Sequence, residues 1–289
     1  MPDPHFAAYS FVDRIVELEP SRHARGTFAI PATIDAFPLA LVAEAVGQLA
    51  AWVAMDAIDF RGRPVAALAA ETRFHGEARP GDTLDLVADV ISCDDEAIAY
   101  NGRARIAGRT VIELVDCLGP MLPVADFDSP DVLRERLALL RGAGAAPGRF
   151  GGIPAIPVAI THRVPGTELR ATCEVPAAAP FFHDHFPRRP VFPATLLLDI
   201  EMGLALDLAR EAAAAAHATP RPLRTTHVKM RSFIVPSQRL EIGVELRPAQ
   251  DGVAKAMLTA RTDDRTVATA RLEIAMERAK RSASEEVRR

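Results

Sequence analysis

The sequence predicts an α+β protein built from two tandem copies of one unit, each a long central helix wrapped by an antiparallel β-sheet. The first observation is internal repetition, because the tripeptide Arg-Thr-Val occurs at 109–111 and again at 265–267. The second is that each copy has one apolar stretch of helical length, followed by alternating segments of strand length. A helix that is apolar on nearly every side must be buried, and a surrounding sheet buries both elements.

Matching segments fix the boundaries of the repeat. The pairs are 27–31 with 172–176, 36–55 with 191–210, 78–90 with 234–246, and 109–111 with 265–267. The offset in numbering is 156 for the last two pairs and 155 for the helical segments, but only 145 for the first pair. The second copy therefore has ten more residues than the first between its first strand and its helix.

Each predicted helix opens with a proline, Pro38 in the first copy and Pro193 in the second. Proline suits the first turn of a helix because the N–H that it lacks would have had no partner there. Turn signals separate the strand-like segments that follow each helix. These signals include Pro-Gly-Asp, Asn-Gly, Ala-Gly and Asp-Asp, of which the first three stand at 80–82, 101–102 and 107–108 in the first copy.

A third helix is predicted between the copies, at 129–140, with Ser129 as its N-cap and Pro130 at the first helical position. The stretch after it is rich in Gly, Pro and Ala, which is typical of a linker. The predicted organisation is an N-terminal unit at 1–125, a helix and linker at 126–157, a C-terminal unit at 158–278 and a charged tail at 279–289.

Composition excludes several classes of function. The net charge of the 289 residues is −4, so neither nucleic acid nor an anionic membrane surface is a predicted partner. Cys93, Cys117 and Cys173 have no metal-ligand spacing and are predicted to be reduced thiols. The amino terminus shows no signal-peptide pattern, and no stretch reaches the roughly 18 apolar residues of a membrane span, so we expect a cytoplasmic protein.

The extra residues of the second copy belong to the string FFHDHFPRRPVFPATLLLD at 181–199. It contains His185 followed by Phe-Pro, a Pro-Val-x-Pro run, and Asp199 fourteen residues after the histidine. This string resembles the β-hydroxyacyl-(acyl carrier protein) dehydratases of bacterial fatty acid synthesis, whose hotdog fold wraps a sheet around a central helix. Because the first copy resembles the same family, the expected architecture is a double hotdog with a degenerate N-terminal copy.

The sequence departs from the family pattern at several positions. Arg188 and Ala194 replace two glycines, and Gly203 stands where the family has a glutamine. The first copy has no histidine loop, yet Glu44 and Gln48 keep the acid and the glutamine of the pattern. The copy that keeps the histidine has therefore lost the glutamine, and the copy that lost the histidine keeps it.

The resemblance implies dehydration of 3-hydroxyacyl thioesters to trans-2-enoyl thioesters. This elimination needs a base for the α proton, an acid for the leaving hydroxyl and a hydrogen-bond donor for the thioester oxygen. Histidine suits the base, and a buried carboxylic acid has its pKa raised enough to donate a proton. His185 is the expected base, and the N–H of Ala194, at a helix amino terminus, is the expected donor.

The family site lies between two hotdogs, and this implies that His185 works with the acid of the other copy. We therefore expect one site that combines His185 with Glu44, oriented by Gln48. Asp199 is the alternative acid, and otherwise it marks a second site without a histidine. The side chains expected to contact substrate are those of Gln48, Phe186, Val191, Pro193 and Ala194.

The resemblance also implies partners. The substrate would be carried on the phosphopantetheine of an acyl carrier protein or of coenzyme A, in fatty acid, polyketide or polyene synthesis, and no cofactor or metal is expected. Arg188 and Arg189 are either a docking site for an acidic carrier or a solvated charge pair. A homodimer of double hotdogs is possible. The alternative functions are a hotdog thioesterase and a non-catalytic hotdog partner in a synthase complex.

Overall fold

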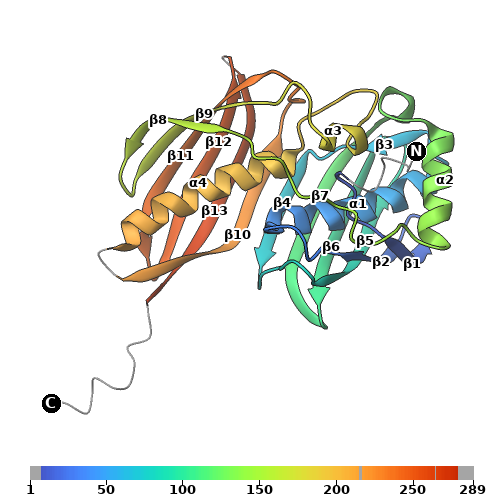
Figure 1. Ribbon diagram of the computed structural model, residues 1–289, viewed down its shortest axis with the longest axis horizontal. Coiled ribbons are helices and arrows are strands. Elements are labelled where there is room, and N and C mark those ends of the chain that lie inside the picture. The colour runs from blue at the N-terminus through green and yellow to red at the C-terminus, as the bar shows by residue number, and fades with distance from the viewer. Residues whose placement is uncertain (1–7, 215–216, 264, 279–289) are drawn as a thin grey trace, which may run out of the picture.

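The computed structural model describes residues 8–214, 217–263 and 265–278, and its two units share one curved antiparallel sheet (Figure 1). The first unit comprises β1 (Arg14–Glu19), β2 (His23–Ala29), α1 (Leu39–Ala57), β3 (Gly62–Pro64), β4 (Leu68–Phe74), β5 (Thr83–Cys93), β6 (Ala97–Ile106) and β7 (Arg109–Pro123). The connection carries the 3-10 turn η1 (Val124–Asp126) and α2 (Pro130–Arg141). The second unit comprises β8 (Val158–Val164), β9 (Glu168–Glu174), α3 (Phe181–Asp184), α4 (Ala194–Ala214), β10 (Ala218–Met230), β11 (Arg239–Gln250), β12 (Val253–Thr262) and β13 (Arg265–Arg278).

The strand order shows how the units join. Within the described residues the order is β1-β2-β5-β6-β7-β4 in the first unit and β10-β13-β12-β11-β9-β8 in the second. The two halves meet where β4 pairs antiparallel with β10. One unit's strand order thus mirrors the other's about this seam, and the α+β double hotdog expected from the sequence is confirmed in its architecture.

The repeat read from the sequence recurs in the positions of the elements. β5 begins at Thr83 and its counterpart β11 at Arg239, while the helices α1 and α4 begin at Leu39 and Ala194. The first strands of the pattern, β2 and β9, begin at His23 and Glu168, which is the smaller separation that the sequence predicts. The extra residues of the second copy lie between β9 and α4, and they hold α3 and His185.

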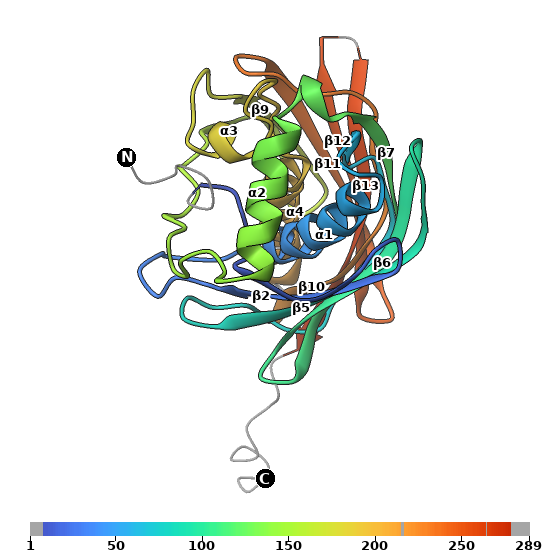
Figure 2. The same cartoon turned by 90° about the vertical axis from the view of Figure 1, so that its right-hand side faces the viewer.

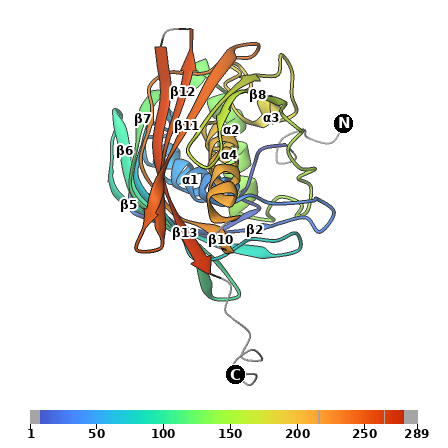
Figure 3. The ribbon, with the colours of Figure 1, turned by 90° about the vertical axis from the view of Figure 1, so that its left-hand side faces the viewer.

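The two long helices lie end to end beneath the sheet. Viewed along the long axis, α4 lies behind α1 while the strands curve around both (Figure 2). From the opposite end, α4 lies under the strands of the second unit and β8 forms the outer edge (Figure 3). The helices contact each other at their amino-terminal ends, where Thr195 of α4 bonds to Glu44 of α1.

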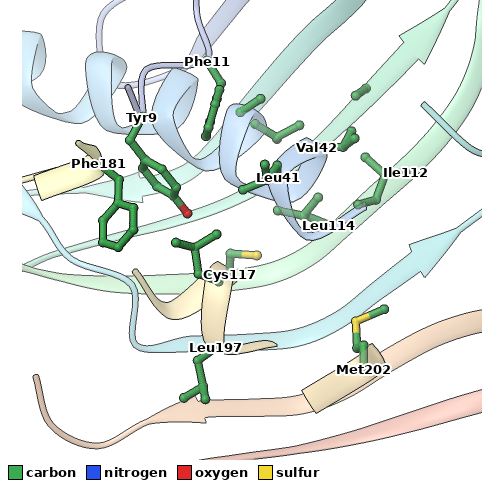
Figure 4. Close-up of a cluster of buried hydrophobic side chains, with 14 of the residues drawn as sticks. Tyr9, Phe11, Leu41, Val42, Ile112, Leu114, Cys117, Phe181, Leu197 and Met202 are labelled. Atoms are coloured by element: carbon green, nitrogen blue, oxygen red, sulfur yellow. The ribbon is translucent and has the colours of Figure 1, made fainter. Parts of the chain in front are cut away.

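A single hydrophobic core runs through both units. Side chains from the first unit, such as Tyr9, Leu41 and Leu114, pack in the same cluster as Phe181 and Leu197 of the second (Figure 4). This continuity follows from the antiparallel seam, since the inner face of one sheet continues into that of the other.

By length and composition α1 would be able to cross a membrane, which differs from the expectation drawn from the sequence. It has 19 residues and a mean hydropathy of 1.4. However, Leu41, Val42, Ala45 and Val46 on this helix are fully buried against the rest of the protein. The helix is apolar because it is the core of the first unit, and core helices of this length pass the same hydropathy test.

The connection between the units is better anchored than a flexible linker. α2 begins at Pro130 as predicted, although Ser129 makes no side-chain capping hydrogen bond. Farther along, Phe150 is buried against Phe11 and Phe37, with ring centroids 5.1 and 5.9 Å apart. The predicted charged tail, 279–289, lies outside the described residues.

One predicted turn is wrong. Asn101 and Gly102 lie inside β6, at an irregularity in its pairing with β7. The turn between these strands is at Ala107 and Gly108, which have φ values of 48° and 77°. Asn101 uses its side-chain carbonyl to accept the N–H of Asp116 across the irregularity, so the polar residue serves the strand.

Candidate active site

A cavity of about 240 Å³ lies at the junction of the two units. Glu44 and Gln48 of α1 line it from the first unit, and His185, Phe186 and Thr195 line it from the second. The rest of its wall is mostly apolar and comes from α1, the β3–β4 connection, β7 and the β10–β11 loop. The residues that the sequence singled out as base and acid therefore share one cavity, although they lie in different copies of the repeat.

His185 follows directly after the short helix α3. Its backbone N–H donates to Phe181 O at 2.9 Å, and its ring Nδ1 lies 3.2 Å from the carbonyl oxygen of Val191. A carbonyl only accepts, so Nδ1 carries the hydrogen and Nε2 is left as the basic nitrogen. Burial, with the nearby charge of Arg63, lowers the pKa of His185 to about 3. The imidazole is therefore neutral at pH 7 and able to accept a proton.

The histidine loop is fastened to the first unit. Phe186 packs with Phe127, Val65 and Val191 in a small second core at the edge of the cavity. Phe186 has a φ of 61°, which is strained for a residue with a side chain and requires firm support from its surroundings. The contact with Phe127, at 4.8 Å between ring centroids, supplies part of that support.

The two arginines of the loop add to this attachment. The guanidinium of Arg188 donates to Ala125 O at 3.1 Å, and its backbone N–H donates to Phe127 O at 3.0 Å. Arg189 lies over the rings of Phe127 and Phe233, 5.7 and 4.9 Å from their centroids. Both side chains are exposed, but they attach the loop to the connection that follows β7 and to Phe233 of the second unit rather than simply pointing into solvent.

Glu44 has a hydrogen-bond donor on each carboxylate oxygen. Gln48 Nε2 donates to Oε1 at 3.0 Å, and Thr195 Oγ1 donates to Oε2 at 2.8 Å. Burial raises the pKa of Glu44, while these two donors and the charge of Arg63 act in the opposite direction. Gln48 is thus in direct contact with Glu44, which is the neighbour that the resemblance assigns to it.

Tyr9 and Thr195 were not predicted as site residues. The Tyr9 hydroxyl lies 2.6 Å from Thr195 Oγ1, and the Tyr9 ring packs edge-on against the His185 ring at 5.4 Å. The Tyr9 carbonyl also accepts from Gln48 Nε2 at 2.9 Å. Tyr9 thus contacts His185 directly and reaches Glu44 through both Thr195 and Gln48.

Asp184 ties the amino-terminal segment to the histidine loop. Its carboxylate accepts the backbone N–H groups of Ala8 and Tyr9, both at 2.9 Å, and it is only 5% exposed. Because Asp184 immediately precedes His185, these bonds hold His185 and the Tyr9 segment in one arrangement.

Arg63 is a second unpredicted group beside the site. Its Nη1 lies 3.3 Å from Asp128 Oδ2, and its guanidinium lies 4.6 Å from the centre of the Phe186 ring. Burial is the main reason that its pKa falls to about 10, which still leaves it positively charged at pH 7. That charge disfavours a proton on His185 and favours ionisation of Glu44.

Asp199, the alternative acid, does not line this cavity. It is partly buried one helical turn after Thr195, and burial raises its pKa to about 6. Gly203, four residues later, is exposed, so no side chain takes the place that Gln48 has beside Glu44. The pairing expected between the copies, His185 with Glu44, is the one whose members meet in the cavity.

Of the predicted substrate contacts, Gln48, Phe186, Val191 and Ala194 line the cavity. Pro193 is buried outside the lining, where its carbonyl accepts the N–H groups of Leu196 and Leu197 at 3.1 and 3.2 Å. Ala194 is the first residue of α4, and the leading N–H groups of a helix have no partner within it. A backbone donor at this end of α4 is available to an anionic oxygen.

The side chains around the cavity do not form a typical metal site. Among the described residues, no group of three or more His, Cys, Asp or Glu side chains is placed to hold an ion. Cys93, Cys117 and Cys173 form no disulfide bond with one another. What the arrangement offers is a neutral imidazole, a partly buried carboxyl group and helix N–H donors around one apolar cavity, which suits proton transfer on an apolar substrate.

Comparison with known proteins identifies the family. The ApeI-like family model, described as ApeI dehydratase, matches residues 161–271. A 3-hydroxyacyl-(acyl-carrier-protein) dehydratase FabZ from Anaeromyxobacter sp. (strain Fw109-5) is 32% identical over 117 residues, which cover 37% of this chain and 70% of that protein. The corresponding protein of Caldicellulosiruptor saccharolyticus is 29% identical over 130 residues, covering 41% of this chain and 89% of its own.

Solved structures resemble the whole chain in fold. A putative oleoyl thioesterase from Lactobacillus plantarum superposes with a TM-score of 0.59 at 10% sequence identity, covering 90% of this chain and 98% of its own. At that identity the likeness establishes the fold alone. With the sequence relatives, it follows that the chain belongs to the hotdog-fold family of FabZ-like 3-hydroxyacyl-(acyl-carrier-protein) dehydratases.

Proposed function

We propose that this protein is a lyase that dehydrates 3-hydroxyacyl thioesters to trans-2-enoyl thioesters. The observation that carries the proposal is that His185 of the second unit and Glu44 of the first line the same cavity. The base is neutral, the acid has a raised pKa, and the amino terminus of α4 opens onto the same space. Each group that the elimination needs is supplied by a different segment of the chain.

In the proposed reaction, Nε2 of His185 takes the α proton of the substrate. The electron pair of the broken C–H bond forms the double bond through an enolate-like state, whose oxygen is stabilised by N–H groups at the start of α4. The C–O bond at the β carbon then breaks as Glu44 gives its proton to the departing hydroxyl, which leaves as water. The turnover leaves His185 protonated and Glu44 ionised, and the two must exchange a proton with solvent before the next cycle.

We further propose that the acyl group arrives as a phosphopantetheine thioester, on an acyl carrier protein or on coenzyme A, in fatty acid, polyketide or polyene synthesis. The reaction is an acid–base elimination without a redox change, so it requires no cofactor. We also propose a cytoplasmic protein, in keeping with its relatives in fatty acid synthesis. A homodimer of double hotdogs remains an expectation of the sequence.

The test is a dehydration assay on a 3-hydroxyacyl carrier-protein thioester, with the enoyl product followed by mass. We expect His185→Ala and Glu44→Gln each to lower kcat at least a hundredfold, since general acid and base groups contribute about 10²–10⁴-fold. Asp199→Asn is the matched control, because Asp199 is an acid on the other long helix outside the cavity lining, and we expect it to retain most of the activity.

Other results would redirect the assignment. Loss of activity in Asp199→Asn but not in Glu44→Gln would refute the pairing of His185 with Glu44. Release of free thiol without enoyl product would favour a thioesterase. No turnover of any chain length by the wild type, on carrier protein or on coenzyme A, would favour a non-catalytic partner in a synthase complex.

A further inference from the structure

A chain of two hydroxyl groups ends on the proposed acid. The Tyr9 hydroxyl lies 2.6 Å from Thr195 Oγ1, which in turn donates to Glu44 Oε2 at 2.8 Å. Tyr9 comes from the segment before β1, Thr195 from the first turn of α4 and Glu44 from α1. Both units therefore contribute to the environment of one carboxylate oxygen.

Oε1, the other carboxylate oxygen of Glu44, faces the side-chain nitrogen of Gln48, which can donate a hydrogen bond but cannot accept one. Phe11 N–H donates to Gln48 Oε1 at 2.8 Å, which fixes the orientation of the amide. Gln48 Nε2 is then the end that donates to Glu44 Oε1 at 3.0 Å. An amide nitrogen does not accept a hydrogen bond, so a proton of Glu44 is disfavoured on the side of Gln48. The arrangement favours protonation at Oε2, the oxygen that faces Thr195.

A hydroxyl, unlike an amide nitrogen, both donates and accepts. When Glu44 is ionised, Tyr9 donates to Thr195 and Thr195 donates to Glu44. When Glu44 is protonated at Oε2, the direction reverses, with Glu44 donating to Thr195 and Thr195 to Tyr9. The acid therefore keeps a hydrogen bond in both states, which matters because an unsatisfied polar group at a partly buried site is costly.

We propose that Thr195 and Tyr9 are positioning residues that hold the exchangeable proton of Glu44 at Oε2 and set how readily Glu44 releases it. The inference rests on the proposed function, in which Glu44 is the general acid. Tyr9 has a second reason to act in this way, since its ring also packs against His185 and its carbonyl accepts from Gln48.

The test is a direct titration of Glu44 in the full chain without substrate. ¹³C-carboxyl NMR of glutamate-labelled protein resolves the group, and the Glu44 signal is the one that disappears in Glu44→Gln. Thr195→Val removes the donor at nearly constant volume, and we expect the pKa of Glu44 to rise by about one unit. Tyr9→Phe should shift it in the same direction by less, and Thr195→Ser should restore the wild-type value.

A side chain that lines the same cavity provides a matched control. Thr72→Val removes a hydroxyl that makes no hydrogen bond to Glu44 among the described residues, and we expect the Glu44 titration to stay unchanged. An unchanged titration in Thr195→Val, or an equal shift in Thr72→Val, would overturn the proposal. If Thr195→Val does not fold, a pKa in Tyr9→Phe that is unchanged or lower would overturn it as well.

A kinetic measurement links the titration to the reaction. The alkaline limb of the pH profile of kcat/KM should follow the loss of the Glu44 proton in the free enzyme, so it should move upward by the same amount in Thr195→Val. The two proposals fail separately. A wild type whose Glu44 titrates as expected but that produces no enoyl thioester would refute the proposed function and leave the positioning role standing.

Discussion

Glu201 is a buried carboxyl group whose ionisation affects the stability of the whole protein. It lies on α4, is 2% exposed, and its Oε1 has no hydrogen-bond partner within the described residues. Burial raises its pKa from 4.5 to about 8. The matching position on α1 in the first copy of the repeat is Val46, which is fully buried. The second unit thus carries a carboxyl where the first has an alkyl group.

We predict that Glu201 makes the protein less stable as the pH rises. Between about pH 4.5 and 8 the unfolded chain ionises this group while the folded protein holds its proton, so the folded state binds more protons and stability falls with rising pH. Each unit of pKa difference corresponds to about 1.4 kcal/mol. Urea denaturation at pH 5 and pH 8 gives the free energy of unfolding at each pH. Between these two values, that free energy should fall by a few kcal/mol less in Glu201→Gln than in the wild type.

The exposed residue Glu241, on β11, provides the control. Glu241→Gln should keep the pH dependence of the wild type, because an exposed carboxyl has nearly the same surroundings in both states. If Glu201→Gln and the wild type lose equal stability between the two pH values, Glu201 is not the buried acid described here.

At this scale the sequence predicts only part of the candidate site. His185, Glu44 and Gln48 could be predicted because they stand at fixed spacings in a long pattern. Tyr9 and Thr195 could not, because their roles depend on contacts between segments 186 residues apart, which no local pattern records. Tyr9 lies before the first element of the repeat, so the pattern shared by the two copies does not include it.

Two glycines, one packed against α1 and one on α4, differ in the space available for a side chain. A Cβ added at Gly102 of β6 would lie 2.3 Å from Val46 Cγ1 on α1 and 3.0 Å from the carbonyl oxygen of Val87. The helix and the strand can therefore approach this closely only if the strand has no side chain there. At Gly203 of α4 an added Cβ would meet nothing within 4 Å.

We predict opposite effects of the same substitution at these two positions. Gly102→Ala should destabilise the protein by about 1–3 kcal/mol, because it overpacks the contact between α1 and β6. Gly203→Ala should stabilise it by roughly 0.5–1 kcal/mol, since alanine is the better helix former at an exposed position. Denaturant midpoints of the two variants measure both effects. Equal effects of the same sign would show that the distance between α1 and β6 is not set by Gly102.

At the scale of the elements, the repeat in the sequence predicts most of the helices and strands. The numbering offset between the two copies is ten residues smaller at β2 and β9 than at α1 and α4. The inserted residues, which hold the histidine loop, must therefore lie between β9 and α4. The turn predicted at Asn101-Gly102 was wrong because a local signal was overridden by a contact with a distant segment. This dipeptide is a strong local signal for a turn, but the close contact with Val46 uses the glycine instead.

At the scale of the whole molecule, the seam between β4 and β10 makes the two units interdependent. Arg224 of β10 lies 2.8 Å from Glu71 of β4 and also 2.8 Å from Glu273 of β13, so one guanidinium links strands of both units. Beneath the seam, the hydrophobic core is continuous and the cavity is lined from both sides. The predicted domain boundaries describe the repeat along the chain, whereas the packing joins the copies in space.

We predict that the two units unfold in one cooperative transition. Trp52 is the single tryptophan and lies on α1, so its fluorescence reports on the first unit. Leu258 lies on β12 of the second unit and is fully buried. Leu258→Ala should cost about 2–5 kcal/mol and should lower the Trp52 fluorescence midpoint by roughly 5 °C or more, together with the far-UV circular dichroism midpoint.

The same measurement separates cooperation from independence. Leu139→Ala, which truncates a leucine that is 39% exposed on α2, controls for the substitution itself and should leave both midpoints nearly unchanged. If Leu258→Ala split the circular dichroism transition and left the Trp52 midpoint in place, the units would unfold separately. The proposed catalytic pair would then depend on the docking of two independently stable units, because His185 and Glu44 line the cavity from opposite sides of their junction. A joint shift would mean instead that any loss of core packing in the second unit also loosens the cavity.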